Sequence, residues 1–223
     1  MSESFDNAYD RDGLPSILRQ FARRRTNTEK CELCSAELSS AHSHLLEPVK
    51  RQILCACEGC AILFCGQSGA HFLRIPRRIV LLADLQMTDM QWESLMIPIN
   101  LAFFYRDSAS SKMIAMYPSP AGATESQLSL ESWEEIGSQN RVLQTMEPAV
   151  EAFLVNRVGT EAEYFLVPID ECFRLVGLIR MHWKGLSGGT EVWKQIQQYF
   201  TDLHARASHA QGRDENRPEV MRA

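Results

Sequence analysis

Cysteine is the residue that most constrains how this chain can fold. The sequence contains seven cysteines, and all but one of them lie between positions 31 and 65. The clustered cysteines are Cys31, Cys34, Cys55, Cys57, Cys60 and Cys65, whereas Cys172 stands alone in the second half of the chain. In a cytosolic protein, such crowding indicates metal binding or redox chemistry before disulfide bonds.

Two Cys-x-x-Cys pairs stand out within the cluster. Cys31 and Cys34 form the first pair, and Cys57 and Cys60 form the second. Two such pairs can place four thiolates about 2.3 Å from one tetrahedral zinc ion. The sequence therefore predicts a metal site made of these four cysteines, with Zn²⁺ as the metal and iron as the alternative.

Three nearby residues offer alternative ligands. Cys55 lies two positions before Cys57, and we prefer Cys57 because it completes the second Cys-x-x-Cys pair. His42 and His44 could also coordinate a metal, although they are spaced more closely than the two histidines of a zinc finger. A site closed by four cysteine thiolates has no open coordination position, so we do not expect a hydrolytic centre.

Composition and charge limit the possible function classes. The chain has 223 residues, of which 45% are hydrophobic and 23% charged, as in ordinary globular proteins. Its formal net charge of −5 argues against a general nucleic-acid-binding protein. No apolar run is long enough for a transmembrane helix, and the first residues are polar and acidic. We therefore expect a cytoplasmic protein.

Changes in composition along the chain predict four parts. Residues 1–28 are expected to contain an amphipathic basic helix, because apolar residues recur at helical spacing among several arginines. That basic face could dock on a partner or be a solvated surface. Residues 29–80 form the predicted zinc-knuckle module, here called the cysteine module. Residues 81–206 are predicted to form an α+β domain, and residues 207–223 a disordered tail.

Periodicity and turn residues predict the elements of these parts. In the cysteine module, a hairpin with its turn near Pro48 and a helix after Cys60 would give a treble-clef-like arrangement. In the α+β domain, residues 118–123 are predicted to be a proline-punctuated loop, and Asp170 is expected to cap a helix. The expected strands of that domain cover residues 99–105, 113–117, 150–158 and 164–167. One helix is expected around Trp133, and three more are expected to begin after Thr88, Asp170 and Thr190. The predicted fold class is α+β: a small treble-clef-like zinc module followed by an antiparallel-sheet domain with helices.

Signatures of catalysis are missing from the sequence. It contains no P-loop, no dinucleotide-binding glycine fingerprint, no G-x-S-x-G elbow and no H-E-x-x-H pair. Cys172 lies on the apolar side of a predicted helix, so we expect a core residue rather than a nucleophile. A binding role is therefore more strongly expected than an enzymatic one.

Several longer motifs resemble those of a known family. They are CELC at 31–34, IPINLAFF at 97–104, YPSPAGATES at 117–126, CFRLVG at 172–177 and WKGLSGG at 183–189. Together they resemble an uncharacterised bacterial zinc-knuckle family encoded near high-affinity uptake nickel-iron hydrogenases, over about residues 29–205. The resemblance implies a link to hydrogen oxidation through gene neighbourhood, and it implies hydrogenase subunits or maturation factors as protein partners.

Three functions remain to be weighed at this point. The first is a non-catalytic zinc-binding accessory protein that supports assembly, maturation or function of a nickel-iron hydrogenase. The second is a rubredoxin-like electron-transfer protein with an iron-tetrathiolate centre, although Ser35 and Ala61 replace the glycines expected after each knuckle. The third is an HNH-type nuclease with His44 as general base, although no asparagine lies between His44 and Cys57.

Overall fold

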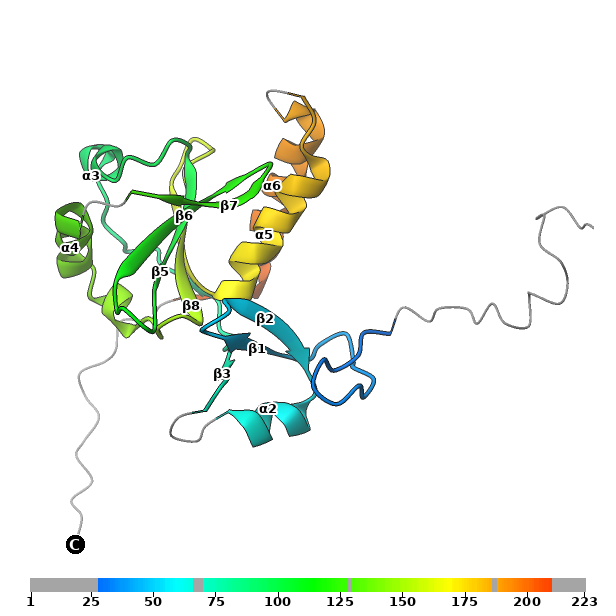
Figure 1. Ribbon diagram of the computed structural model, residues 1–223. Coiled ribbons are helices and arrows are strands. Elements are labelled where there is room, and N and C mark those ends of the chain that lie inside the picture. The colour runs from blue at the N-terminus through cyan, green and yellow to red at the C-terminus, as the bar shows by residue number, and fades with distance from the viewer. Residues whose placement is uncertain (1–27, 66–69, 128–129, 186–187, 210–223) are drawn as a thin grey trace, which may run out of the picture.

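The computed structural model describes residues 28–65, 70–127, 130–185 and 188–209, and these residues form an α+β fold. A three-stranded sheet and a seven-stranded sheet are combined with five α-helices in the described part of the chain. Figure 1 shows the smaller sheet below the larger one, with helices on both sides of the larger sheet. None of the described helices is long and apolar enough to cross a membrane.

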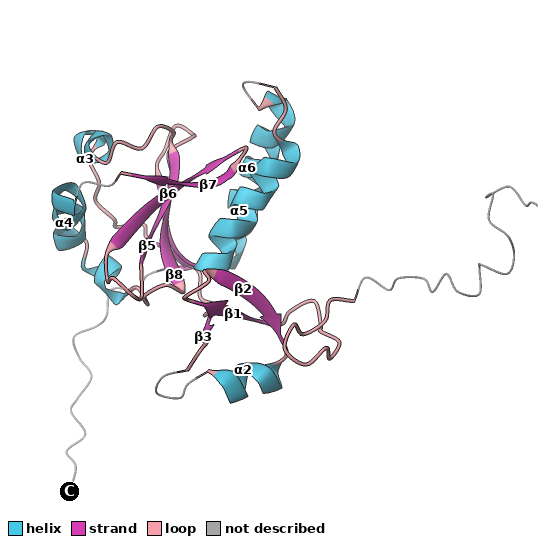
Figure 2. Ribbon diagram, viewed as in Figure 1, coloured by secondary structure: helices cyan, strands magenta, loops and turns pink. Residues whose placement is uncertain are grey.

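The cysteine module has the predicted treble-clef-like order of knuckle, hairpin and helix. Strands β1 (Ser43–Glu47) and β2 (Gln52–Ala56) form an antiparallel hairpin around a turn at residues 48–51. Strand β3 (Leu73–Arg74) pairs with the other edge of β1. Helix α2 (Glu58–Phe64) begins two residues after β2 ends. Figure 2 shows β1, β2 and β3 together with α2 below the strands of the larger sheet.

The larger domain is built on a nearly all-antiparallel sheet. Its strands are β4 (Val80–Leu81), β5 (Leu101–Arg106), β6 (Met113–Ser119), β7 (Gly122–Ser126), β8 (Glu151–Asn156), β9 (Glu163–Pro168) and β10 (Ser208–His209). Their spatial order is β10-β4-β9-β8-β5-β6-β7, and only β10 and β4 run parallel. The two hairpins predicted from the sequence, β5–β6 and β8–β9, form the centre of this sheet.

Helices cover both faces of the larger sheet. They are α3 (Asp89–Ser94), α4 (Leu130–Gln139), the 3₁₀ helix η1 (Arg141–Thr145), α5 (Ile169–His182) and α6 (Gly189–Arg206). Helices α5 and α6 pack against one face, while α3, α4 and η1 pack against the other. Thr88 caps α3 with the capping box that the sequence predicted, since its hydroxyl accepts the Gln91 N–H and the Gln91 side chain accepts the Thr88 N–H.

Alternation along the central strands separates the two cores of this domain. In β5, Phe103 and Tyr105 belong to the core under α5 and α6, whereas Ala102 and Phe104 belong to the core under α3 and α4. Because both faces of the sheet are covered, the strand is apolar along its length rather than alternately apolar and polar.

The cysteine module shares a core with the α+β domain. Successive residues of β1 point to opposite faces, so Leu45 packs with the clustered cysteines and Leu46 packs into the core under α5 and α6. Ile75 and Ile79, which connect β3 to β4, join the same core as Leu46. The hairpin is therefore the structural link between the metal-ligand cluster and the larger domain.

One predicted loop is instead the tip of a β-hairpin. Residues 118–123 were expected to form a proline-punctuated loop, but β6 continues to Ser119 and β7 starts at Gly122. Pro118 lies beyond Met116, the last residue of β6 that pairs with β5, so its missing N–H leaves no gap in a ladder on that side. Gly122 has a φ of 132°, which suits glycine and permits the tight turn.

The expected helix cap at Asp170 is also wrong. Helix α5 begins at Ile169 after Pro168, and Asp170 lies inside its first turn. There its carboxylate still interacts favourably with the helix dipole. Its side chain is engaged by a residue of the cysteine module, as described below.

Two of the predicted boundaries meet elements of the larger sheet. The boundary drawn between residues 80 and 81 falls inside β4, which pairs with β9. The predicted tail includes β10, which pairs with β4. The remaining residues of that tail, 210–223, and the basic helix predicted within residues 1–28 lie outside the described residues, apart from Thr28.

Candidate metal centre

The first cysteine pair lies in a tight knuckle at the start of the described chain. An isolated bridge between Lys30 and Glu37 closes the knuckle. Within it, the Cys31 N–H donates to Ala36 O at 2.8 Å and the Ser35 N–H donates to Cys31 O at 2.7 Å. Ser35 adopts a left-handed backbone with a φ of 63°, which turns the chain directly after Cys34.

The second pair is held by the start of α2. Cys57 is the N-cap of this helix, and its Sγ atom accepts the Cys60 N–H at 3.4 Å. The thiol thus takes the place of the usual oxygen cap, while Cys60 lies in the first turn and is buried. Both sulfur atoms of the pair are therefore fixed by the same helix terminus.

These two knuckles bring all four predicted ligands together. The Sγ atoms of Cys31, Cys34, Cys57 and Cys60 lie within 4.8 Å of one another, and those of Cys34 and Cys57 are 3.7 Å apart. Four zinc–thiolate bonds of about 2.3 Å in a tetrahedron would separate the sulfur atoms by about 3.8 Å. The four cysteines could hold a metal ion, and their donor set suits zinc or iron.

The thiols differ in their electrostatic surroundings. Burial raises the pKa of Cys31, but backbone N–H groups of both knuckles, led by that of Cys57, outweigh it and lower the pKa to about 6. Burial and the neighbouring sulfur atoms raise the pKa of Cys60 to about 12. Without a cation, the four thiols resist losing all their protons, because the resulting thiolate charges would repel one another. A divalent ion at their centre would offset that repulsion.

The alternative ligands form a group of their own. His42, His44 and Cys55 each offer a donor atom, and these three atoms also lie within 4.8 Å of one another. Cys55 is thus grouped with the two histidines, whereas Cys57 is grouped with the other knuckle cysteines. From the sequence these residues were expected only as substitutes for a ligand, and a separate cluster was not predicted.

A residue that was not predicted from the sequence completes this second group. Asp170 of α5 places its Oδ2 atom 2.5 Å from Nδ1 of His44. No local pattern could have revealed the contact, because it depends on how the cysteine module packs against α5. The His-x-His alternation at residues 42–44 was the available signal, since residues two apart on a strand share a face.

The two remaining cysteines lie outside both groups. Cys65 follows α2 and packs, half-buried, against the small core of the cysteine module. Cys172 lies on the buried face of α5 and is completely buried, and this burial raises its pKa well above the ordinary value. A thiol with a raised pKa is a poor nucleophile, so both observations agree with the predicted packing role of Cys172.

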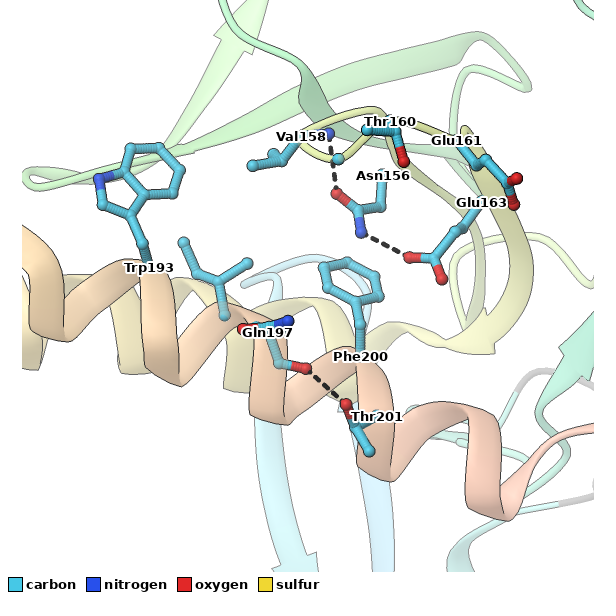
Figure 3. Close-up of a pocket in the computed structure, with 11 residues that line it drawn as sticks. Asn156, Val158, Thr160, Glu161, Glu163, Trp193, Gln197, Phe200 and Thr201 are labelled. Atoms are coloured by element: carbon cyan, nitrogen blue, oxygen red, sulfur yellow. Dashed lines mark hydrogen bonds between the residues drawn. The ribbon is translucent and has the colours of Figure 1, made fainter.

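A hollow of about 510 Å³ lies elsewhere, between the β8–β9 turn and α6. Figure 3 shows Asn156 at its centre, where the side chain accepts the Val158 N–H and donates to Glu163. Trp193 and Thr201 lie on the helix side. Because the Asn156 amide is engaged by its own hairpin, we interpret it as a support for the turn rather than as a ligand-binding group.

Comparisons with known proteins give one match. A protein-family model described as "Family of unknown function (DUF5947)" matches residues 30–207. This range contains both cysteine pairs, the histidines His42 and His44, and all five described α-helices. Neither curated proteins nor solved structures gave a match to the chain.

Proposed function

The chain belongs to the DUF5947 family of unknown function, and on that premise we propose that it is a non-catalytic zinc-binding accessory protein that acts through protein–protein contacts. Zinc would be held by Cys31, Cys34, Cys57 and Cys60. The observation that carries this proposal is the donor set, in which four thiolates from two knuckles fill the coordination sphere of one ion. Such a closed site leaves no position for water or substrate and supports a structural role.

The size of the module's own core supports the same role. Its buried apolar residues are Cys31, Leu45, Ala56, Cys60 and Ala61. Two of these are themselves metal-ligand candidates, so little hydrophobic surface remains to hold the knuckles in place. In modules of this kind the free energy of metal binding contributes directly to folding.

Helix α2 offers a surface for a partner protein. Ile62 and Leu63 are 67% and 62% exposed, and Phe64 is also exposed. These three consecutive exposed apolar residues end a short helix whose N-cap and first turn carry two of the proposed zinc ligands. They favour a contact surface, because zinc would fix the helix that presents them. We define Ile62, Leu63 and Phe64 as the α2 patch.

The partner class follows from the motifs described above. Their resemblance to a family encoded near uptake nickel-iron hydrogenases favours a hydrogenase subunit or a maturation factor as the protein that binds the α2 patch. The protein would then support assembly, maturation or function of the hydrogenase without reacting with its substrate.

Co-purification from the native host tests this proposal. Tagged wild-type protein is expected to capture a nickel-iron hydrogenase subunit or maturation factor, identified by mass spectrometry. Ile62→Lys with Leu63→Lys should lose that capture and keep the metal content and melting temperature, because both side chains are exposed. Met181→Lys, at an exposed apolar residue on α5, is the matched control. Equal capture by the α2 variant, or no hydrogenase protein among the partners, would contradict the proposal.

A rubredoxin-like centre is the second candidate because one donor, Cys34, is exposed. Electron transfer requires a redox centre close to the surface, and iron accepts four thiolates as readily as zinc does. The colour of the purified protein separates the two candidates, since a ferric tetrathiolate absorbs visible light and zinc does not.

A further inference from the structure

A second set of metal donors lies on the hairpin face opposite to Leu45. Cys55 of β2 is paired directly with His44 of β1, so both side chains project from the same face. His42 precedes His44 by two residues, and its Nε2 atom lies 3.1 Å from Nε2 of His44. Pairing register and alternation thus explain why these three donors meet.

The hydrogen bonds of the two histidines leave both Nε2 atoms as electron-pair donors. Nδ1 of His42 lies 2.9 Å from the carbonyl oxygen of Ser39, and Nδ1 of His44 lies 2.5 Å from the Asp170 carboxylate. Both partners only accept hydrogen bonds, so each Nδ1 carries a hydrogen. Two neutral imidazoles would then direct lone pairs at each other, and this contact requires a proton or a cation between them.

The spacing of the donors fits a metal ion. Two zinc–nitrogen bonds of about 2.05 Å at the tetrahedral angle would separate the nitrogen atoms by about 3.3 Å. The Cys55 sulfur lies within 4.8 Å of both histidine donors and adds a third ligand on the same side. Asp170 and the Ser39 carbonyl provide the outer hydrogen bonds that fix the tautomer of metal-binding histidines.

The site is accessible from a hollow of about 250 Å³. His42, His44 and Asp170 line this hollow together with Arg77 and Arg206. Arg206 is engaged by Glu171, whereas the exposed Arg77 adds positive charge at the rim. A fourth ligand from solvent could therefore reach an ion bound at the three donors.

We propose that His42, His44 and Cys55 form a second metal site, for a divalent first-row transition-metal ion such as Zn²⁺, with a fourth coordination position open to solvent. Three protein ligands and one open position are the arrangement of zinc sites that exchange a ligand, in contrast to the closed four-thiolate site. Two nitrogen donors and one sulfur donor suit zinc, cobalt and copper rather than magnesium or calcium. The inference uses different residues from the proposed function, but the metal count that tests it rests on the proposed four-thiolate site holding one ion.

Metal counting on the full chain tests this site. Wild-type protein is loaded with excess Zn²⁺, desalted and analysed by mass spectrometry for metal per chain. We expect two equivalents, and one equivalent after brief treatment with a chelator, because the open site exchanges faster than the closed one. His42→Ala, His44→Ala and Cys55→Ser should each bind one equivalent. That remaining equivalent, held by the four thiolates, also reports that the variant has folded.

Matched controls come from the same module. His71→Ala and Cys65→Ser remove a histidine and a cysteine outside the donor group, and both variants should bind two equivalents. Asp170→Asn keeps all three ligands but weakens the outer hydrogen bond, so its affinity for the second Zn²⁺ should fall by about 10- to 100-fold. That affinity change would identify Asp170 as a positioning residue.

Cobalt tests the open position. In protein loaded with Co²⁺ at both sites, added azide should shift the visible bands of wild type and leave those of Cys55→Ser unchanged. One equivalent of zinc in loaded wild type would overturn the second site and assign a proton to the His42–His44 contact. Two equivalents in each of the three ligand variants would overturn it as well. A wild-type cobalt spectrum unaffected by azide would contradict the open position.

Discussion

Nδ1 of His44 lies 2.5 Å from Oδ2 of Asp170, although the two residues are 126 positions apart in the sequence. This contact joins β1 of the cysteine module to the first turn of α5. Leu46, two residues after His44 on the same face of β1, packs into the core under that helix. This face of β1 therefore contacts the larger domain through both a polar and an apolar side chain.

Alternation in β1 predicts different effects for two neighbouring leucines. Leu45→Ala should reduce metal retention, because Leu45 packs with Cys31 and Cys60 in the module's small core. Leu46→Ala should lower the free energy of unfolding of the larger domain by about 2–5 kcal/mol and leave metal retention unchanged. Metal analysis and denaturant unfolding measure the two effects. Equal metal loss in both variants would show that the two cores are not separate.

An ion pair between the exposed Arg78 and the buried Glu151 fixes the connection between the two parts. Arg78 donates two hydrogen bonds, at 2.5 and 2.6 Å, to Glu151, whose side chain is fully buried in β8. Arg78→Ala should cost about 3 kcal/mol of unfolding free energy, because it leaves a buried carboxylate without its cation. Arg77→Ala, at the exposed neighbouring position, should change stability little. Chemical denaturation of the two variants measures the difference in their free energies of unfolding. Similar losses of stability in both would rule out this role of the ion pair.

Glu171 predicts a loss of stability in acid. Burial raises the pKa of Glu171, but the guanidinium groups of Arg206 and Arg174 outweigh it and hold the pKa below its usual range. Since the folded pKa is lower than the unfolded one, the contribution is present above about pH 4.5 and disappears as the pH falls through the folded pKa. The free energy of unfolding of wild type should therefore exceed that of Glu171→Gln at neutral pH. This difference should become smaller as the pH falls from about 5 to about 3. Glu131→Gln, at an exposed position of α4, should show no such convergence in the same denaturation series.

Much of this architecture could be predicted from local patterns. The two Cys-x-x-Cys pairs, the Thr88 capping box and the continuous apolar runs of the central strands each depend on neighbouring residues. The missed features depend on distant contacts. Strand β7 was missed because proline and glycine at residues 118–122 are typical of loops. Whether a strand can accommodate them depends on which strands pair at that position, and the local sequence does not show this.

The separate histidine–cysteine group could not be predicted for the same reason. Cys55 meets His44 through the register of the β1–β2 hairpin, and Asp170 reaches His44 through domain packing. Sequence spacing offered Cys55 only as a competitor of Cys57, because both lie near the second knuckle. The register of the hairpin, rather than the spacing, assigns the two thiols to different groups.

Serine substitutions separate the two thiols experimentally. Cys57→Ser should lose the metal of the four-thiolate site and destabilise the cysteine module, since it removes both a ligand and the N-cap of α2. Cys55→Ser should keep that metal after chelator treatment. Metal analysis and thermal unfolding of the two variants compare them directly. Metal loss in Cys55→Ser but not in Cys57→Ser would reverse the ligand assignment.

The central claim is that Cys31, Cys34, Cys57 and Cys60 hold a structural zinc ion, and elemental analysis of chelator-treated wild-type protein tests it most directly. We predict about one zinc per chain and no visible absorption, because four thiolates close the coordination sphere of a colourless ion. Protein that folds without metal, or that contains one iron per chain with a visible ferric-thiolate spectrum, would contradict the claim.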